Sequence, residues 1–154
     1  MNKLYVLVGI PGSGKTTWIG NQRWDMSKTA FVSTDGLVEA YAKEQGKTYS
    51  EVFDEYMPTA VKLMVAQVVE ARKAGKDIVW DQTSTTISSR AKKFKMLPDY
   101  KAIAVVFKTP DDTELRRRLK SRPGKHIPQR VIYQMKEHWQ DPTLEEGFAE
   151  IWNT

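Results

Sequence analysis

The sequence contains no cysteine among its 154 residues and only two histidines. Without cysteine, the chain cannot form disulfide bonds or a thiolate metal site, and thiol redox chemistry is excluded. A long apolar run is also missing at the start, where only about six apolar residues precede a glycine-rich turn, too few for a signal peptide or a membrane span. We therefore expect a soluble, intracellular protein of the cytoplasm with no membrane partner.

Positive charge is present in modest excess. The 24 Lys and Arg residues against 19 Asp and Glu give a formal net charge of +5, which suits a polyanionic ligand. Nucleotide phosphate alone would account for such an excess, so the charge does not distinguish DNA from ATP. The length is that of one domain, and we interpret residues 1–154 as a single domain large enough to bury a central sheet.

Short apolar segments alternate with segments of helical periodicity along the chain. The apolar runs predict strands at residues 4–8, 30–33, 77–81 and 102–107. Helices are predicted at residues 15–21, 37–44, 50–74, 88–97, 111–120 and 128–139, with Pro58 as a point where the third could divide. The alternation predicts an α/β fold with a parallel sheet of four to five strands and helices on both faces. Because ligands of such sheets bind beyond the carboxyl ends of the strands, the turns at Gly9, Asp35 and Asp81 should meet in one crevice.

A phosphate-binding pattern, G-x-x-x-x-G-K-S/T, spans residues 9–16 between an apolar strand and a helix. Glycines let the backbone wrap around phosphate oxygens, so that several N–H groups and the positive end of a helix converge on one anion. Lys15 is expected to reach the β and γ phosphates, and Thr16 to bind Mg²⁺ through its hydroxyl. An ordinary glycine turn is the alternative, but it would not require this position between strand and helix. The pattern predicts a P-loop NTPase-type fold that takes ATP and Mg²⁺, with the nucleotide-binding residues Gly9, Pro11, Gly12, Ser13, Gly14, Lys15, Thr16 and Thr17.

Two carboxylates follow other predicted strands. Asp35 comes after the second strand, where it would lie opposite the γ-phosphate and act as general base toward an attacking hydroxyl. A role as helix cap is the alternative, and the two roles can coexist. Asp81 ends a buried strand in the position of a Walker-B-type carboxylate, able to act on Mg²⁺ through water or to hold an arginine or the acceptor. With Thr83 just beyond it, Asp81 is a candidate for substrate binding, a structural cap being the alternative.

The segment after residue 111 is rich in cations. Arg118 and Arg122 flank a basic loop that we interpret as a lid, which could close over the phosphates and stabilise transition-state charge. Successive helical residues point about 100° apart, so at least one of Arg116, Arg117 and Arg118 should face solvent. We predict Arg122 as a catalytic residue and Arg118 as a nucleotide contact, with solvent exposure as the alternative for each.

A P-loop also fits a GTPase switch or an ATP-driven motor. A GTPase would require an N-K-x-D-type segment after a later strand, and residues 107–111 do not supply one. This absence weakens the switch interpretation and favours a kinase.

At the level of whole segments, the chain resembles the polynucleotide 5'-hydroxyl kinases, both the phage enzymes and the kinase domain of the animal end-repair enzyme. The resemblance covers nearly the whole chain and is sharpest near its end. It rests on residues 9–17, on Asp35, on Trp80-Asp81-Gln82-Thr83 in place of an Asp-x-Thr-Asn-like segment, on Ser89-Arg90, on His126-Ile127-Pro128, on Val131, Tyr133 and Lys136, and on residues 142–148 with Ile151.

The resemblance, which near the end of the chain is to the animal kinase domain, implies a phage-like ATP-dependent kinase with Asp35 as base, Asp81 at the acceptor and a lid arginine near Arg122. Lys15 and Thr16 would contact phosphate and magnesium. The phosphatase domain that many relatives carry is missing, so removal of 3'-phosphate is not expected.

One departure concerns arginine. The family has an arginine directly before the base, and phage members have another one turn after it, where this chain has Thr34 and Val38. The contact to the acceptor's own phosphate is then absent or supplied by other cations, for which Arg90, Lys92 and Lys93 are candidates. We include Arg90 among the predicted substrate-binding residues.

Three functions remain open. The first is a kinase for the 5'-hydroxyl of a DNA or RNA end, active in end repair, which would bind nucleic acid through residues 90–130, where 13 Lys and Arg outnumber 4 Asp and Glu. A solvated basic surface is the alternative for that region. The second is a kinase for another hydroxyl, on a modified base such as hydroxymethylated DNA or on a free nucleoside or nucleotide. The third is an NTP-dependent switch.

Overall fold

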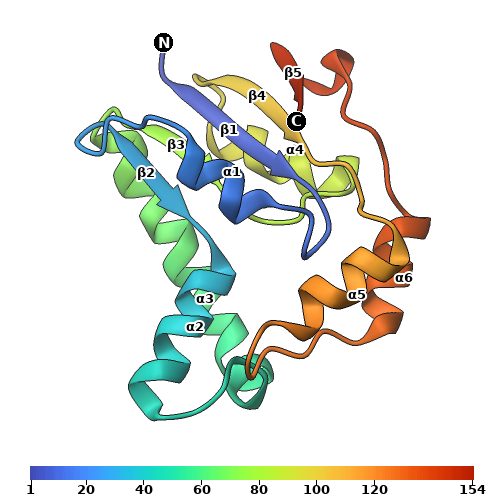
Figure 1. The fold of residues 1–154 in the computed structure, drawn as a ribbon. Coiled ribbons are helices and arrows are strands. Elements are labelled where there is room, and N and C mark those ends of the chain that lie inside the picture. Colours follow the sequence, from blue (N-terminus) through green and yellow to red (C-terminus); the bar gives the residue numbers. More distant parts are fainter.

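A single parallel sheet forms the centre of the molecule (Figure 1). The computed structural model describes all residues from Met1 to Thr154. The strand order is β2-β3-β1-β4-β5, and every neighbouring pair is parallel. The strands are β1 (Lys3–Val8), β2 (Thr29–Val32), β3 (Asp77–Trp80), β4 (Lys101–Val106) and β5 (Glu150–Asn153). The prediction of a parallel α/β sheet with four to five strands is confirmed.

The register of the strands brings their carboxyl ends to one edge. Val6 of β1 lies beside Trp80 of β3 on one side and Ala104 of β4 on the other. Val32 at the end of β2 is in turn paired with Trp80. β1 is buried from Leu4 to Val8 on both faces, which explains its continuous apolar sequence. The segments that follow β1, β2 and β3 therefore begin close together.

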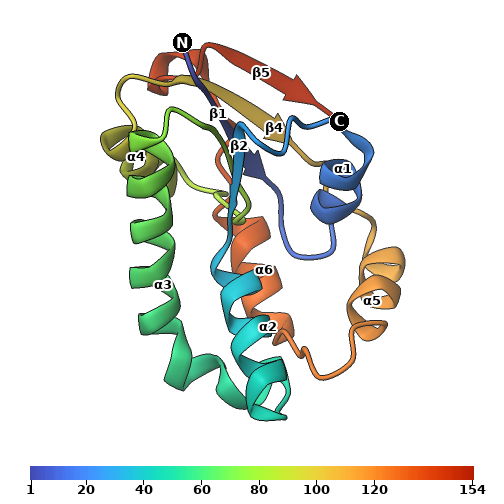
Figure 2. The same ribbon diagram turned by 90° about the vertical axis from the view of Figure 1, so that its left-hand side faces the viewer.

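Helices cover both faces of the sheet (Figure 2). α1 packs against one face through Trp18 and Ile19, in a cluster that includes Val105 of β4. α3 and α4 pack against the other, where Met64 and Phe94 join the largest apolar cluster. The helices are α1 (Lys15–Asn21), α2 (Thr34–Gln45), α3 (Tyr49–Lys73), α4 (Ile87–Met96), α5 (Asp112–Lys120) and α6 (Gln129–Glu137). The predicted two-sided arrangement is therefore present.

α3 runs without a break through Pro58, so the suggestion that this proline could divide the helix is wrong. Proline removes one backbone hydrogen bond and crowds the preceding turn, but Pro58 lies on the exposed side of α3, where water can satisfy the carbonyl. Val52 and Ala60, on either side of it, both pack against α2. The stacked rings of Tyr41 and Tyr56, with centroids 3.9 Å apart, add a further contact between α2 and α3.

β5 was not among the individually predicted strands. It has four residues, none of them fully buried, and it pairs with β4 at the sheet edge. Its sequence, Glu150-Ile151-Trp152-Asn153, lacks the apolar run by which the equally short β2 and β3 were recognised. It is joined to β4 by backbone pairing and by an ion pair of 2.6 Å between Lys101 and Glu150.

None of the helices has the combination of length and hydropathy required to cross a lipid bilayer.

Candidate active site

The loop between β1 and α1 has the shape of a phosphate cradle. Gly14 has φ 103° directly before α1, and Gly12 has φ 82°, backbone conformations that residues with a side chain rarely adopt. Gly9 is required for space instead, since a Cβ there would lie 2.5 Å from Ser13 Oγ and 2.9 Å from Phe107 Cβ. The three glycines therefore allow a tight loop that opens at the N-terminus of α1.

Polar groups of the cradle are poised for an anion. The Ser13 hydroxyl is buried and has no hydrogen-bond partner within the protein, which is the state expected of a group that awaits a ligand. Lys15 Nζ donates to the carbonyl oxygens of Gly9, at 2.7 Å, and Ile10, at 3.0 Å. Burial lowers the pKa of Lys15 to about 8, partly offset by the nearby carboxylate of Asp81. These groups fit the phosphates of a nucleotide.

The donors for a divalent cation are few. Thr16 and Asp81 both line the cavity, and the Asp81 carboxylate makes no hydrogen bond to the protein. Burial raises the pKa of Asp81, an effect that Lys15 opposes. No group of three or more His, Asp or Glu side chains could hold a metal by itself. A hydroxyl and a carboxylate fit Mg²⁺, which is commonly bound through one or two protein ligands, water and the phosphates of a substrate.

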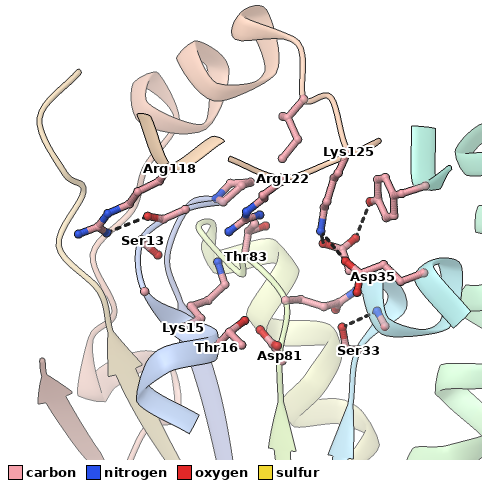
Figure 3. A pocket seen from close by; sticks show the side chains of 18 of the residues that line it. Ser13, Lys15, Thr16, Ser33, Asp35, Asp81, Thr83, Arg118, Arg122 and Lys125 are labelled. Carbon is pink, nitrogen blue, oxygen red and sulfur yellow. Dashed lines mark hydrogen bonds and ion pairs between the residues drawn. The ribbon is translucent and has the colours of Figure 1, made fainter. Parts of the chain in front are cut away.

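One cavity of about 1190 Å³ joins the cradle to the ends of β2 and β3 and to the segment after β4. Thr83 lies in its wall, and the Thr83 carbonyl oxygen accepts a hydrogen bond of 3.0 Å from the Gly9 amide. Gln82 links β3 to the start of α2, because it accepts from Trp80 Nε1 at 3.0 Å and donates to Thr34 Oγ1 at 3.1 Å. Figure 3 shows Lys15, Thr16, Asp81 and Asp35 around the same space. The predicted meeting of the three strand ends is therefore observed.

Asp35 faces this cavity from the first turn of α2. The helix cap is Ser33, whose hydroxyl accepts a 3.1 Å hydrogen bond from the Gly36 amide, so the alternative in which Asp35 serves as the cap is excluded. The Asp35 carboxylate instead accepts hydrogen bonds from the Tyr49 hydroxyl at 2.7 Å and from Lys125 Nζ at 3.2 Å. Its side chain is 51% exposed. A half-exposed carboxylate across the cavity from the cradle can accept a proton.

The basic loop at residues 121–127, which we call the lid, forms the cavity wall opposite Asp81. Arg122 and Lys125 both line the cavity, and the Arg122 guanidinium makes no hydrogen bond or ion pair, although it is near enough to Lys15 to lower the pKa of that lysine. Arg118 is engaged already, donating to the Gly12 carbonyl at 2.9 Å and to Glu114 at 2.8 Å. Arg116 is exposed, as expected for one of three successive arginines. α5 thus bonds to the cradle through Arg118, with Arg117 also in the cavity lining, and the loop after it presents Arg122.

Arg90 does not take part in this site, and its prediction as a substrate-binding residue is wrong. The side chain is fully buried, outside the cavity lining. Its guanidinium donates to both carboxylate oxygens of Glu146, at 2.6 and 3.1 Å, and to the carbonyl oxygens of Ser84 and Gln140. The sequence around Arg90 does not indicate that this residue is buried and paired with Glu146, 56 positions later.

Lys92 and Lys93 also lie outside the cavity lining. Lys93 is 5% exposed. It makes one long hydrogen bond of 3.3 Å, to the Ser89 carbonyl, and its ammonium lies 5.1 Å from the centroid of the Trp80 ring. Burial, together with the charges of Lys92 and Arg90, lowers the pKa of Lys93 to about 8.

This burial has a consequence for stability. Because the folded pKa of about 8 lies below the ordinary value of 10.5, the unfolded chain binds more protons between these pH values, and the free energy of unfolding rises with pH there. We expect Lys93→Met to be more stable than the parent by roughly 1–3 kcal/mol at pH 7, with the difference shrinking above pH 8. Urea unfolding at several pH values measures this. Lys95→Met, at an exposed position of the same helix, is the control, and a difference for Lys93→Met that is independent of pH would contradict the explanation.

Two residues of the site were not recognised from the sequence. Tyr49 and Glu39 surround Asp35 and Lys125, but both are separated from the P-loop by strand β2 and no motif marks them. Of their two partners, Asp35 was predicted as a site residue, and Lys125 was recognised only as part of the basic loop. Burial, together with the hydrogen bond to Asp35, raises the pKa of Tyr49, so that its hydroxyl stays a hydrogen-bond donor.

Comparison with known proteins identifies the family of this chain. The family described as the AAA domain matches residues 4–142. The bifunctional polynucleotide phosphatase/kinase of Schizosaccharomyces pombe is 28% identical over 154 residues, an alignment that covers 97% of this chain and 32% of that protein. The chain therefore spans about a third of the length of this relative.

Solved structures share the fold. A chain of the Pnkp1/Rnl/Hen1 RNA repair complex is similar with a TM-score of 0.64 and 24% identity, over 89% of this chain and 43% of that one. Shikimate kinase from Acinetobacter baumannii, in complex with shikimate, is similar with a TM-score of 0.57 and 21% identity, over 100% of this chain and 84% of that one. Because the matched family model covers most of its length, this chain belongs to the AAA domain family of P-loop proteins, with a polynucleotide kinase among its relatives, in agreement with the resemblance noted in its sequence.

Proposed function

We propose that this protein is an ATP-dependent kinase that transfers the γ-phosphate to a hydroxyl group, most favourably the 5'-hydroxyl of a DNA or RNA end. The observation that carries the proposal is the position of Asp35, whose carboxylate faces the same cavity as Lys15 and the P-loop. Phosphoryl transfer requires a triphosphate site and a base on the acceptor side, roughly in line. Both are available here.

Each residue of the site would have its own role in the reaction. The acceptor hydroxyl gives its proton to Asp35 as its oxygen forms a bond to the γ-phosphorus, and the bond to the bridging oxygen breaks with its electron pair on ADP. Lys15, Arg122 and the cradle amides stabilise the negative charge that spreads over the phosphoryl oxygens. Thr16, with Asp81 through water, would hold Mg²⁺, which neutralises charge on the β and γ phosphates.

Nucleic acid as acceptor is favoured by two observations. The relative from Schizosaccharomyces pombe is described as a polynucleotide phosphatase/kinase. The lid side of the cavity carries the cations Arg117, Arg118, Arg122 and Lys125, which would attract a phosphate backbone and make binding sensitive to salt. A role in repair of nucleic-acid ends follows from this acceptor.

A second candidate is a kinase for a smaller hydroxyl compound, and the acceptor wall favours it. This wall is lined by the acids Asp35, Glu39 and Asp54. Val38 is fully buried between α2 and α3, so its side chain does not reach an acceptor phosphate. The fold likeness to shikimate kinase over that enzyme's length is compatible with this candidate.

Acceptor choice can be tested directly. The protein is incubated with γ-labelled ATP, Mg²⁺ and separate acceptors: 5'-hydroxyl oligonucleotides of DNA and RNA, hydroxymethylated duplex DNA, nucleosides and nucleotides. We expect label on the oligonucleotide 5' ends, with a rate that falls as salt rises. Matched oligonucleotides with a 5'-phosphate are the control and should take no label.

The other outcomes separate the candidates. Label on free nucleosides or nucleotides alone would favour the second candidate and remove the first. Slow hydrolysis with no labelled acceptor would contradict both and favour a nucleotide-dependent switch.

A further inference from the structure

Both oxygens of the Asp35 carboxylate are occupied by donors from the protein itself (Figure 3). Oδ1 accepts from the Tyr49 hydroxyl at 2.7 Å, and Oδ2 accepts from Lys125 Nζ at 3.2 Å. The two donors come from α3 and from the lid loop, which are remote in sequence. The side chain is still 51% exposed with both donors in place, so the donors engage the two oxygens without keeping water away from the carboxylate.

Lys125 is held where it meets Asp35. Its ammonium also donates to Glu39 Oε1 at 3.0 Å and lies 4.5 Å from the centroid of the Tyr49 ring. Although it belongs to a surface loop, its side chain is only 11% exposed. Three groups on α2 and α3 therefore fix the position of this one cation.

The lid backbone is anchored at the same place. The Gly124 carbonyl accepts from the Ser50 amide at 3.1 Å, and the His126 amide donates to Ser50 Oγ at 2.8 Å. These bonds lie on either side of Lys125 in the sequence. The lysine therefore reaches Asp35 from a loop that is docked on the start of α3.

We propose that Lys125 is a specificity-determining residue that prevents water from acting as the phosphoryl acceptor, because it occupies the Asp35 oxygen that the base needs until an acceptor hydroxyl takes its place. The inference rests on the proposed function, in which Asp35 is the base. A kinase whose base is free to take a proton from water would hydrolyse ATP without transfer, and an ion pair that engages the base until the acceptor binds is one means of avoiding this.

Transfer and hydrolysis differ only in the attacking oxygen. In transfer, the acceptor oxygen binds the γ-phosphorus, its proton passes to Asp35, and ADP leaves with the electron pair of the broken phosphorus–oxygen bond. In hydrolysis, water supplies the oxygen and the proton, and inorganic phosphate replaces the phosphorylated product. A free oxygen on Asp35 would serve both reactions equally.

An acceptor can displace Lys125 where water cannot. Its remaining atoms contact the cavity wall, where Phe53 is 36% exposed and Met57 lies one turn away, and binding energy from non-reacting parts of a substrate can drive such a rearrangement. Lys125 Nζ has a second carboxylate partner, Glu39, at 3.0 Å. Lys125 can therefore leave Asp35 and remain paired with Glu39.

The test compares acceptor-independent ATP hydrolysis in the parent and in Lys125→Met, which keeps the length of the side chain. We expect release of inorganic phosphate to rise by about tenfold, a fraction of the 10²–10⁴-fold that a general base contributes. Lys125→Arg keeps the charge and should stay close to the parent. Tyr49→Phe, which opens only Oδ1 and keeps the ring beneath Lys125, should give a smaller rise.

Asp35 must be the origin of the added hydrolysis. In the double variant Asp35→Asn with Lys125→Met, the rise should disappear. In the ligand-free protein, hydrogen exchange at the amides of Ser50 and His126 should be faster in Lys125→Met, since both amides bond across the docked lid.

Each contrary result has a distinct meaning. Hydrolysis that is unchanged or lower in Lys125→Met, a rise that persists in the double variant, or unchanged exchange at His126 would overturn the inference. The hydrolysis assay contains no acceptor, so a failure of the proposed function is read separately, as absence of label on every acceptor in the parent protein.

Discussion

Replacing Asp35 by asparagine is expected to lower the rate of phosphoryl transfer by about 10²–10⁴-fold, the usual contribution of a general base. Asparagine keeps the shape of the side chain but cannot take up the proton of the acceptor hydroxyl. ATP affinity should be largely retained, because Asp35 faces the cavity from α2 and makes no contact with the cradle. Single-turnover transfer of labelled phosphate measures the rate, and titration with a fluorescent ATP analogue measures the affinity.

A matched change at Asp99 provides the control for Asp35. Asp99→Asn removes a carboxylate whose only contact is an exposed ion pair of 3.0 Å with Arg72, and surface pairs of this kind contribute little. Transfer should be unchanged in that variant. If Asp35→Asn lost ATP affinity and rate in equal measure, Asp35 would belong to the nucleotide site and the assignment of the base would be wrong.

Replacing Arg122 by alanine is the second change for which we expect a large effect, a loss of about 10³-fold in kcat, in the range known for arginines that stabilise the transferring phosphoryl group. The Arg122 guanidinium lines the cavity with no partner in the protein, and its charge already acts on Lys15. It can therefore turn to the phosphoryl oxygens at no cost in internal hydrogen bonds. Steady-state kinetics should show kcat falling far more than the KM for ATP rises.

Arg116 supplies the control for Arg122. It is exposed on α5, and Arg116→Ala should leave kcat close to the parent value. Arg122→Lys keeps the charge without the planar donor fork and is expected to recover only part of the rate. An equal loss in Arg116→Ala and Arg122→Ala would indicate a general effect of positive charge on the lid instead of a specific contact.

Features encoded locally could be predicted from the sequence. The cradle depends on glycines at fixed spacing between a strand and a helix, and the structure places Gly12, Gly14 and Lys15 as that spacing requires. The carboxyl ends of parallel strands meet by geometry, so the positions of Asp35 and Asp81 around one cavity also followed from strand assignment alone. The lid loop was recognised by its charge.

Features set by distant partners could not be predicted. The burial of Arg90 could not be predicted, because it depends on an ion pair with Glu146 that only the fold brings together. The cap of α2 is Ser33 and not Asp35. Both residue types are suitable caps, and only the backbone conformation decides between them, which the sequence does not show. The contact between Lys125 and Asp35 joins residues 90 positions apart, and nothing near either residue indicates the other.

The guanidinium of Arg90 and the amide of Gln140 together brace the loop beneath the cradle. Arg90 holds the Ser84 carbonyl, and the Gln140 amide donates to the Thr85 carbonyl at 2.9 Å, while the adjoining Thr83 carbonyl receives the Gly9 amide. The segment from Gln140 to Glu146 makes no hydrogen bond to a predicted nucleotide-binding residue. It nevertheless supports the loop that holds Gly9, the first glycine of the cradle. A chain truncated before Gln140 would retain every motif residue of the P-loop. It would still lose the hydrogen bonds that hold the neighbouring loop at residues 83–85 in position.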